Sequence, residues 1–246
     1  MIKDAITDQG SWLFRRRSYI LLGFAPLFLV AMMRPEPIEM DFGQNWDNIY
    51  EIACVLLAFI GLGIRAFTVG FVPIGTSGRN TRSQVADSLN TTGIYSLTRN
   101  PLYLGNAIMY VAIAMFTQDF YVALTMVLFL VIYMERIIAT EERFLAEKFG
   151  EVYLRWQAET PAFFPRLHGW RTSELPFSVR NMLKREYTGL FLMIAVFFVM
   201  DQGREFINER APIDTGWLIF LIAGATIYIV LRTLKKKTNL LSVPGR

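Results

Sequence analysis

Six long apolar segments constrain the fold of this chain more than any other feature of its sequence. They cover approximately Tyr19–Met33, Ile49–Val72, Leu102–Phe116, Phe120–Ile138, Tyr187–Ile207 and Gly216–Leu234. A helix needs roughly 20 residues to cross the hydrocarbon core of a bilayer. The second, fourth, fifth and sixth segments reach that length, whereas the first and third, at about 15 residues each, are short. We therefore predict an all-α integral membrane protein with about six transmembrane helices.

The composition agrees with a membrane protein. Of the 246 residues, 53% are hydrophobic and 19% are charged, whereas soluble domains average roughly 45–50% apolar and about 25% charged residues. This balance excludes a disordered chain and a disulfide-framed secreted module. With one cysteine, Cys54, and one histidine, His168, the sequence has no structural zinc motif, and we expect no metal ion.

The basic residues predict the orientation of the helices. The chain contains 25 lysines and arginines. Of these, 21 lie in segments that would share one face of the membrane, three lie in the alternate loops, and Arg65 lies inside the second apolar segment. By the positive-inside rule, both termini would be cytoplasmic, and we expect a multi-pass protein of the bacterial inner membrane that does not bind nucleic acid. A cleaved signal peptide is disfavoured because no small-residue cleavage site follows Met33.

Polar residues gather on the predicted cytoplasmic side just before the third apolar segment. Asn100 and Pro101 are typical of a helix start, where unpaired N–H groups and the positive dipole end attract an anion. Arg99 can hold a carboxylate or a phosphate at two points. Gly105 allows close approach, and Tyr103 offers an aromatic face. Singly, Arg99 also fits a snorkelling anchor, and Asn100-Pro101 a simple cap.

A second polar stretch follows the fourth apolar segment. It contains Glu135, Glu141 and Glu142 and leads to Tyr153 and Trp156. Because only Asp119 and its neighbours separate the third and fourth segments, these form a tight helical hairpin that returns both glutamates to the face of Arg99. Singly, the glutamates fit a solvated helix end and the aromatics an interfacial belt. Together, the cation and the carboxylates suit a zwitterionic ligand.

The order of these residues resembles a known family. The elements are Arg99-Asn-Pro-Leu-Tyr-Leu-Gly105, the hairpin, Glu141-Glu142, Phe149-Gly150, Tyr153, Trp156, Pro161 and Pro165. They resemble the isoprenylcysteine carboxyl methyltransferases, which group with the phospholipid methyltransferases as integral-membrane enzymes. The resemblance covers roughly residues 90–166 and implies S-adenosylmethionine as the methyl donor.

The resemblance and the residues together give a set of candidate site residues. Those expected at the cofactor are Tyr95, Arg99, Asn100, Pro101, Tyr103, Gly105, Glu141, Glu142 and Tyr153. Those expected at the substrate are Arg65, Arg79, Arg82 and Trp156, and those expected in catalysis are Arg99, Glu142 and Glu159. The chain departs from the family at two positions. Asn100 stands where the family commonly has histidine. Glu159 stands near the position at which the prenylcysteine enzymes have an arginine that is linked to the carboxylate of the substrate. The second departure disfavours a prenylcysteine substrate.

We therefore expect a methyltransferase acting on a membrane-embedded lipid or lipidated acceptor with a phosphate, carboxylate or amine head. An anionic acceptor needs no general base, whereas an amine needs one, from Glu135, Glu141, Glu142 or Glu159. The alternatives are a non-catalytic lipid-binding or transport protein and a membrane reductase of the sterol-reductase type. We expect three regions: two spans in 1–73, the methyltransferase core in 74–170, and two spans in 171–246.

Overall fold

The structure is a computed structural model that describes residues 2–73, 75–76, 86–208 and 212–246. Within these ranges the secondary structure is helical, apart from an isolated bridge between Gly93 and Arg171. The helices are α1 Ile2–Ile20, η1 Leu21–Phe24, α2 Ala25–Met32, α3 Pro37–Phe42, α4 Gln44–Phe71, η2 Ile94–Ser96, α5 Pro101–Met115, α6 Phe120–Phe149, α7 Glu151–Glu159, α8 Val179–Asn208 and α9 Thr215–Lys237. The all-α prediction is confirmed.

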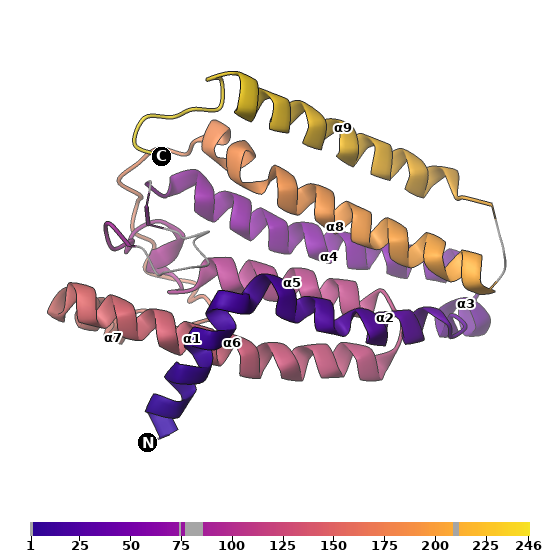
Figure 1. Ribbon diagram of the computed structural model, residues 1–246, viewed down its shortest axis with the longest axis horizontal. Coiled ribbons are helices and arrows are strands. Elements are labelled where there is room, and N and C mark those ends of the chain that lie inside the picture. The colour runs from indigo at the N-terminus through magenta and orange to yellow at the C-terminus, as the bar shows by residue number, and fades with distance from the viewer. Residues whose placement is uncertain (1, 74, 77–85, 209–211) are drawn as a thin grey trace.

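The long helices form a bundle in which α4 is central. Helix α4 packs against α5 on one side and α8 on the other, while α9 covers α8, and α6 packs against α5 and α1 (Figure 1). The start of α1, helix α7 and the C-terminus lie at one end of the bundle, and α3 lies at the opposite end (Figure 1).

Among the described residues, four segments are long and apolar enough to cross a membrane. They are Leu21–Phe42, Gln44–Phe71, Phe120–Phe149 and Thr215–Lys237. Helix α5 is apolar but shorter, as expected for the third segment, and α8 carries Asp201 and Arg204 toward the end of its apolar stretch. The membrane class is thus supported by the structure, and the count of six spans stays a prediction.

The first predicted segment differs from the structure, because it is not one continuous helix. Helix α1 ends at Ile20, a 3₁₀ turn follows, and α2 starts at Ala25 with a proline, Pro26, in its first turn. Proline has no N–H group and clashes with the preceding turn, so an α-helix cannot continue through it without a break. The basic and polar residues that precede the apolar stretch therefore belong to a separate helix, α1.

The hairpin between α5 and α6 is confirmed and has a defined turn. Gln118 adopts a positive φ of 57°, which lets the chain reverse within the 116–119 connection. The Asp119 carboxylate then caps α6 by accepting hydrogen bonds from the N–H groups of Tyr121 (2.8 Å) and Val122 (3.2 Å). The start of α5 and the second half of α6 consequently lie at the same end of the bundle, as the candidate site requires.

Candidate active site

Arg99 joins three elements at the start of α5. Its Nε and Nη2 atoms donate to the two carboxylate oxygens of Glu142 in α6, at 2.7 and 3.1 Å. Its Nη1 atom donates to the carbonyl oxygens of Gln157 (2.8 Å) and Thr160 (2.6 Å) at the end of α7. The two charged side chains are largely buried, with 12% and 15% of their surface exposed. The planar guanidinium therefore serves as a two-point clamp, as its chemistry predicts.

Two amides complete the environment of Glu142. Gln157 Nε2 donates to Glu142 Oε2 at 3.0 Å. Asn100 Nδ2 donates to the carbonyl oxygen of Ala162 at 2.9 Å and, more weakly, to Glu142 Oε1 at 3.4 Å. Asn100 is the N-cap residue of α5, and the helix starts at Pro101 as predicted, but the Asn100 side chain makes no capping hydrogen bond to α5. The first-turn N–H groups of α5 are left for another acceptor.

Glu141 and Tyr153 form the second part of the cluster. The Tyr103 hydroxyl donates to Glu141 Oε1 at 2.8 Å. Tyr153 is fully buried, and its hydroxyl has no hydrogen-bond partner among the described residues. Burial raises the pKa of Tyr153, the Glu142 charge raises it further, and the Arg99 charge lowers it. The Tyr153 hydroxyl is therefore a neutral, buried donor in the field of the Arg99–Glu142 pair.

The aromatic residues Tyr95 and Trp156 belong to the same cluster. The Trp156 indole Nε1 donates to the backbone oxygen of Tyr95 at 3.2 Å, and its ring lies edge-on to Tyr153 with 5.6 Å between centroids. Burial raises the pKa of Tyr95, and the neighbouring Glu141 charge raises it further. A ligand beside these rings would meet aromatic faces and neutral hydroxyl groups.

Arg65 lies in a polar contact between α4, α5 and α8, where its side chain packs against Gly105 and its charge acts on Tyr95. Its Nε and Nη2 atoms donate to the two Glu186 oxygens, both at 3.0 Å, and Nη1 donates to Asn106 Oδ1 at 2.7 Å. The sequence indicated Arg65 because it interrupts an apolar segment, but its partner Glu186 was missed. A carboxylate at the edge of the fifth apolar segment was the available signal. Arg79 and Arg82 lie outside the described residues.

Glu159 lies at the end of α7 and pairs with Arg171 at 2.8 Å, with both side chains about half exposed. Its backbone oxygen accepts from Arg166 Nη1 at 2.8 Å, and Arg166 also donates twice to the backbone oxygen of Ser96. The stretch after α7 is thereby fixed to η2 and to the start of α5. Gln157, Thr160, Ala162 and Arg166 were not expected at the site, because most of these contacts use backbone oxygens that carry no sequence signal.

The arrangement has the features that bind a zwitterion. The start of α5 attracts an anionic group, Glu141 attracts an ammonium group, and the buried rings of Tyr153 and Trp156 belong to the same cluster. The Arg99–Glu142 pair holds these elements in one geometry. Such a set of donors, acceptors and rings has no nucleophilic cysteine or histidine, so it suits binding and alignment of reactants.

Comparisons with known proteins match this part of the chain to one family. Residues 50–152 match the family model described as phospholipid methyltransferase. This matched segment contains Arg99, Glu141 and Glu142. No solved structure matches the chain.

Two curated relatives carry names of another kind. The cobalt-zinc-cadmium resistance protein CzcN of Cupriavidus metallidurans is 35% identical over 133 residues, which are 53% of this chain and 58% of that protein. The nickel-cobalt-cadmium resistance protein NccN of Alcaligenes xylosoxydans xylosoxydans is 33% identical over 170 residues, 68% of this chain and 73% of that protein. The chain thus matches somewhat more than half the length of the first of these relatives.

Proposed function

Because the chain belongs to the phospholipid methyltransferase family, we propose that it is an S-adenosylmethionine-dependent methyltransferase of the membrane. The acceptor would be a membrane-embedded lipid, or a lipidated molecule, with a phosphate, carboxylate or amine head. The observation that carries the proposal is the buried cluster around the Arg99–Glu142 pair, in which the Tyr153 hydroxyl is left without a partner among the described residues.

The residues present fit S-adenosylmethionine. The uncapped N–H groups of α5 would bind its carboxylate, and Glu141 would bind its amino group or a ribose hydroxyl. The Tyr153 hydroxyl would donate a hydrogen bond to the bound ligand, and the rings of Tyr95 and Tyr103 would contact the adenine or the sulfonium. Arg99 already donates to four protein acceptors, so we propose that it mainly positions α5 and α7.

When bound, S-adenosylmethionine would supply a methyl group carried on a positively charged sulfur. The acceptor atom would form its bond to the methyl carbon, and the carbon–sulfur bond would break in the same step. The protein would align the reactants and exclude water. A phosphate or carboxylate acceptor would release no proton. An amine acceptor would give one up, and Glu141 is the better candidate to receive it, because both Glu142 oxygens already accept hydrogen bonds from Arg99 and Gln157.

We propose that the site faces the cytoplasm from the inner membrane of a bacterium, with both termini on the cytoplasmic side. The basic surplus at the end of the bundle that carries α7 supports this orientation. A lipid head would reach the cluster from the side, between helices, since the acceptor resides in the bilayer. Trp156 lies beside Tyr153 within the cluster, and we propose that it contacts the acceptor.

Binding of S-adenosylmethionine to the purified protein in detergent tests the cofactor site. Isothermal calorimetry should show one site in the wild type. Arg99→Ala and Glu142→Ala should abolish binding, while Glu135→Gln, on an exposed part of the same helix, should bind like the wild type. Expression and solubilisation of each variant show whether it still folds. Unchanged binding in both alanine variants would refute the site.

Turnover identifies the acceptor. The protein is incubated with methyl-labelled S-adenosylmethionine and a total membrane lipid extract, and the labelled products are separated. A labelled lipid supports the proposal, whereas label in protein points to a lipidated polypeptide. Binding without any labelled product favours a non-catalytic lipid-binding or transport protein, and oxidation of a nicotinamide cofactor in a parallel assay would favour the reductase alternative.

The names of CzcN and NccN connect these two relatives with resistance to cobalt and cadmium, and to zinc or nickel. We propose that methylation by this chain changes a membrane lipid in the same physiological setting. A strain lacking the protein should then be more sensitive to cobalt, zinc or cadmium, and a copy carrying Glu142→Ala should fail to restore growth. Full rescue by that variant would separate metal resistance from methyl transfer.

A further inference from the structure

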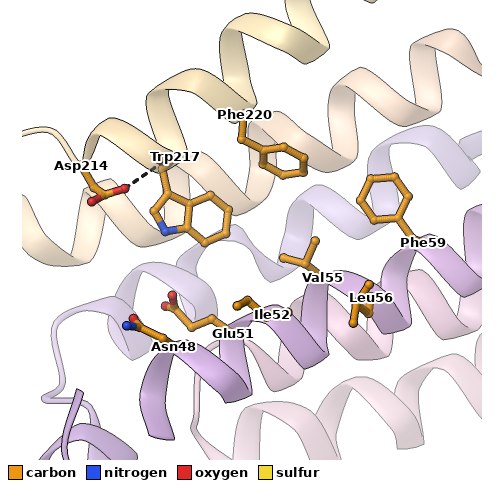
Figure 2. A pocket seen from close by; sticks show the side chains of 10 residues that line it. Asn48, Glu51, Ile52, Val55, Leu56, Phe59, Asp214, Trp217 and Phe220 are labelled. Atoms are coloured by element: carbon orange, nitrogen blue, oxygen red, sulfur yellow. Dashed lines mark hydrogen bonds between the residues drawn. The ribbon is translucent and has the colours of Figure 1, made fainter. Parts of the chain in front are cut away.

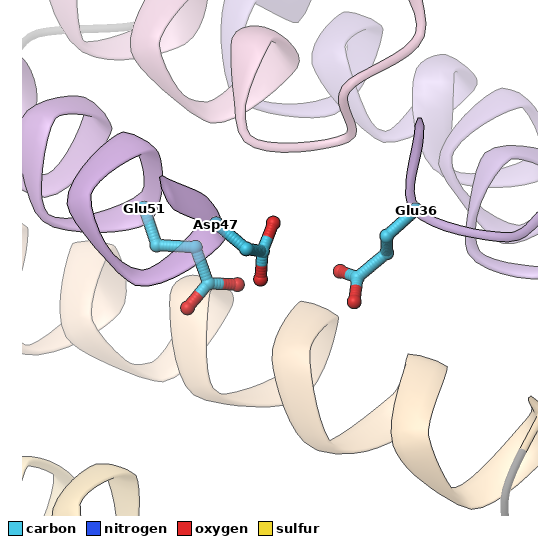
Figure 3. A group of neighbouring side chains, drawn as sticks. All are labelled: Glu36, Asp47 and Glu51. Atoms are coloured by element: carbon cyan, nitrogen blue, oxygen red, sulfur yellow. The ribbon is translucent and has the colours of Figure 1, made fainter. Parts of the chain in front are cut away.

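Three carboxylates converge at the end of the bundle opposite to the Arg99 site. Glu36 lies just before α3, and Asp47 and Glu51 lie in the first turns of α4. One carboxylate oxygen from each lies within 4.8 Å of the others. Figure 3 shows the Glu36 carboxylate turned toward the other two. This spacing allows all three groups to bind a single ion.

The three carboxylates differ in their partners, and Glu51 is the informative one. Glu36 forms an ion pair with the buried Arg204, and Asp47 accepts a hydrogen bond from Gln118 Nε2 at 2.5 Å. Glu51 is 8% exposed, and among the described residues no hydrogen bond reaches its carboxylate. A carboxylate that is largely shielded from water and has no compensating donor or cation is unfavourable, so its position indicates that a partner is missing.

The charges around Glu51 define that partner. The neighbouring charged groups that act on it are Asp47, Asp201, Glu205 and Asp214, all of them acidic. Arg204 also lies in this region, but it is paired with Glu36 and donates to the backbone oxygen of Phe116 at 3.1 Å. One arginine leaves a surplus of negative charge, which a cation of higher charge would neutralise.

The region has an access route. A pocket of about 430 Å³ between α4 and α9 is lined at one end by Asn48, Glu51 and Asp214 and elsewhere by apolar side chains, including Trp217. Figure 2 shows the Glu51 carboxylate at the polar end of this pocket, near the Trp217 ring. An ion can therefore reach Glu51 without passing through the packed core.

We propose that Glu36, Asp47 and Glu51 form a binding site for a divalent cation. The donors are all carboxylate oxygens, the ligands that Mn²⁺, Mg²⁺ and Ca²⁺ prefer, with water completing the coordination. The site is independent of the methyltransferase cluster, because the length of α5, roughly 22 Å for its 15 residues, separates the two ends. From the sequence alone no metal ion is expected, because the three residues are separated along the chain and form no known metal-binding motif.

Binding of Mn²⁺ tests the proposal, because its electron paramagnetic resonance signal distinguishes free from bound ion. The full chain in a neutral detergent should bind one Mn²⁺ per molecule, and competition with Mg²⁺, Ca²⁺, Co²⁺ or Zn²⁺ ranks the ions. Glu51→Gln and Asp47→Asn should each weaken Mn²⁺ binding at least tenfold. The matched control is Asp41→Asn, an exposed carboxylate on α3, which should bind like the wild type.

A second measurement keeps the test independent of folding. Glu51→Gln removes like-charge repulsion, so without added ion this variant should melt at a higher temperature than the wild type. Addition of Mn²⁺ should raise the melting temperature of the wild type and leave that of Glu51→Gln unchanged. The absence of Mn²⁺ binding in the wild type, or equal binding by Glu51→Gln, would overturn the site and indicate carboxyl groups that carry protons instead. Neither result depends on S-adenosylmethionine binding.

Discussion

We predict that removal of the Tyr153 hydroxyl stabilises the ligand-free protein and weakens the binding of S-adenosylmethionine. A buried hydroxyl without a partner costs about 1–3 kcal/mol, so Tyr153→Phe should raise the melting temperature of the ligand-free protein. If the hydroxyl donates to the cofactor, the same variant should bind S-adenosylmethionine about tenfold more weakly, or about 1.4 kcal/mol. Differential scanning fluorimetry and calorimetry measure the two effects.

The control for this variant is Tyr19→Phe, because the Tyr19 side chain is 72% exposed. It should change neither quantity. A Tyr153→Phe protein that melts earlier and binds the cofactor normally would show that the hydroxyl stabilises the fold through a partner of its own, and it would remove Tyr153 from the proposed site.

Individual contacts show what the sequence could and could not predict at this scale. The motif identified Arg99, Glu142 and Tyr103, because their residue types and order are distinctive. It did not show that Arg99 and Glu142 bind each other, since either could equally have faced a ligand. The contacts of the Thr160 and Ala162 carbonyl oxygens could not be predicted from the sequence, because every residue type has a backbone carbonyl.

Among the helices, the crossing of α4 and α5 depends on two glycines. A Cβ atom at Gly61 would lie 2.6 Å from the Gly105 carbonyl oxygen and 2.8 Å from Met109 Cγ. Small residues let helix backbones approach closely in a membrane. Gly61→Ala should therefore force the helices apart and destabilise the protein by about 1–3 kcal/mol, measured as a lower melting temperature.

Gly63 is the matched control on the same helix, because a Cβ atom there would meet nothing within 4 Å. Gly63→Ala should be neutral, or should stabilise by up to about 1 kcal/mol through its higher helix propensity. Equal destabilisation by both substitutions would show that helix flexibility, and not the close crossing, requires glycine in this segment.

The Arg65–Glu186 ion pair joins α4 to α8. Its removal tests the packing of these two helices. Its side chains are 19% and 7% exposed, so removal of the Glu186 charge leaves the largely buried Arg65 charge with a neutral partner, Asn106, in place of a carboxylate. Glu186→Gln should destabilise the protein by about 3–5 kcal/mol, whereas the double variant Arg65→Met/Glu186→Leu should regain most of that loss. The melting temperatures of the wild type, the single variant and the double variant measure these changes in stability. A double variant as unstable as the single one would show that the ion pair itself stabilises the contact.

For the whole molecule, hydropathy predicted the long helices well, since apolar runs of this length have few other solutions. It did not predict how they pack or where α1 ends. The order α9, α8, α4, α5, α6 depends on side-chain contacts between segments distant in sequence, such as Gly61 with Gly105. The break before α2 depends on Pro26, which a hydropathy average does not register.

The last prediction concerns the orientation of the whole bundle. Cys54 is the only cysteine in the chain and is 2% exposed, so the wild type should not react with a membrane-impermeant maleimide. Asp41, on α3, and His168, after α7, are exposed and lie on the acidic and basic sides of the predicted topology. In intact bacterial cells, Asp41→Cys should be labelled and His168→Cys should be labelled only after the cells are permeabilised. This result follows if the basic end faces the cytoplasm. The reverse pattern would invert the orientation and place the Arg99 cluster outside the cell, where no supply of S-adenosylmethionine is expected. Labelling of both positions from the same side would contradict the predicted topology. The helices α4, α5 and α6 lie between the two positions and are expected to place them on opposite faces of the membrane.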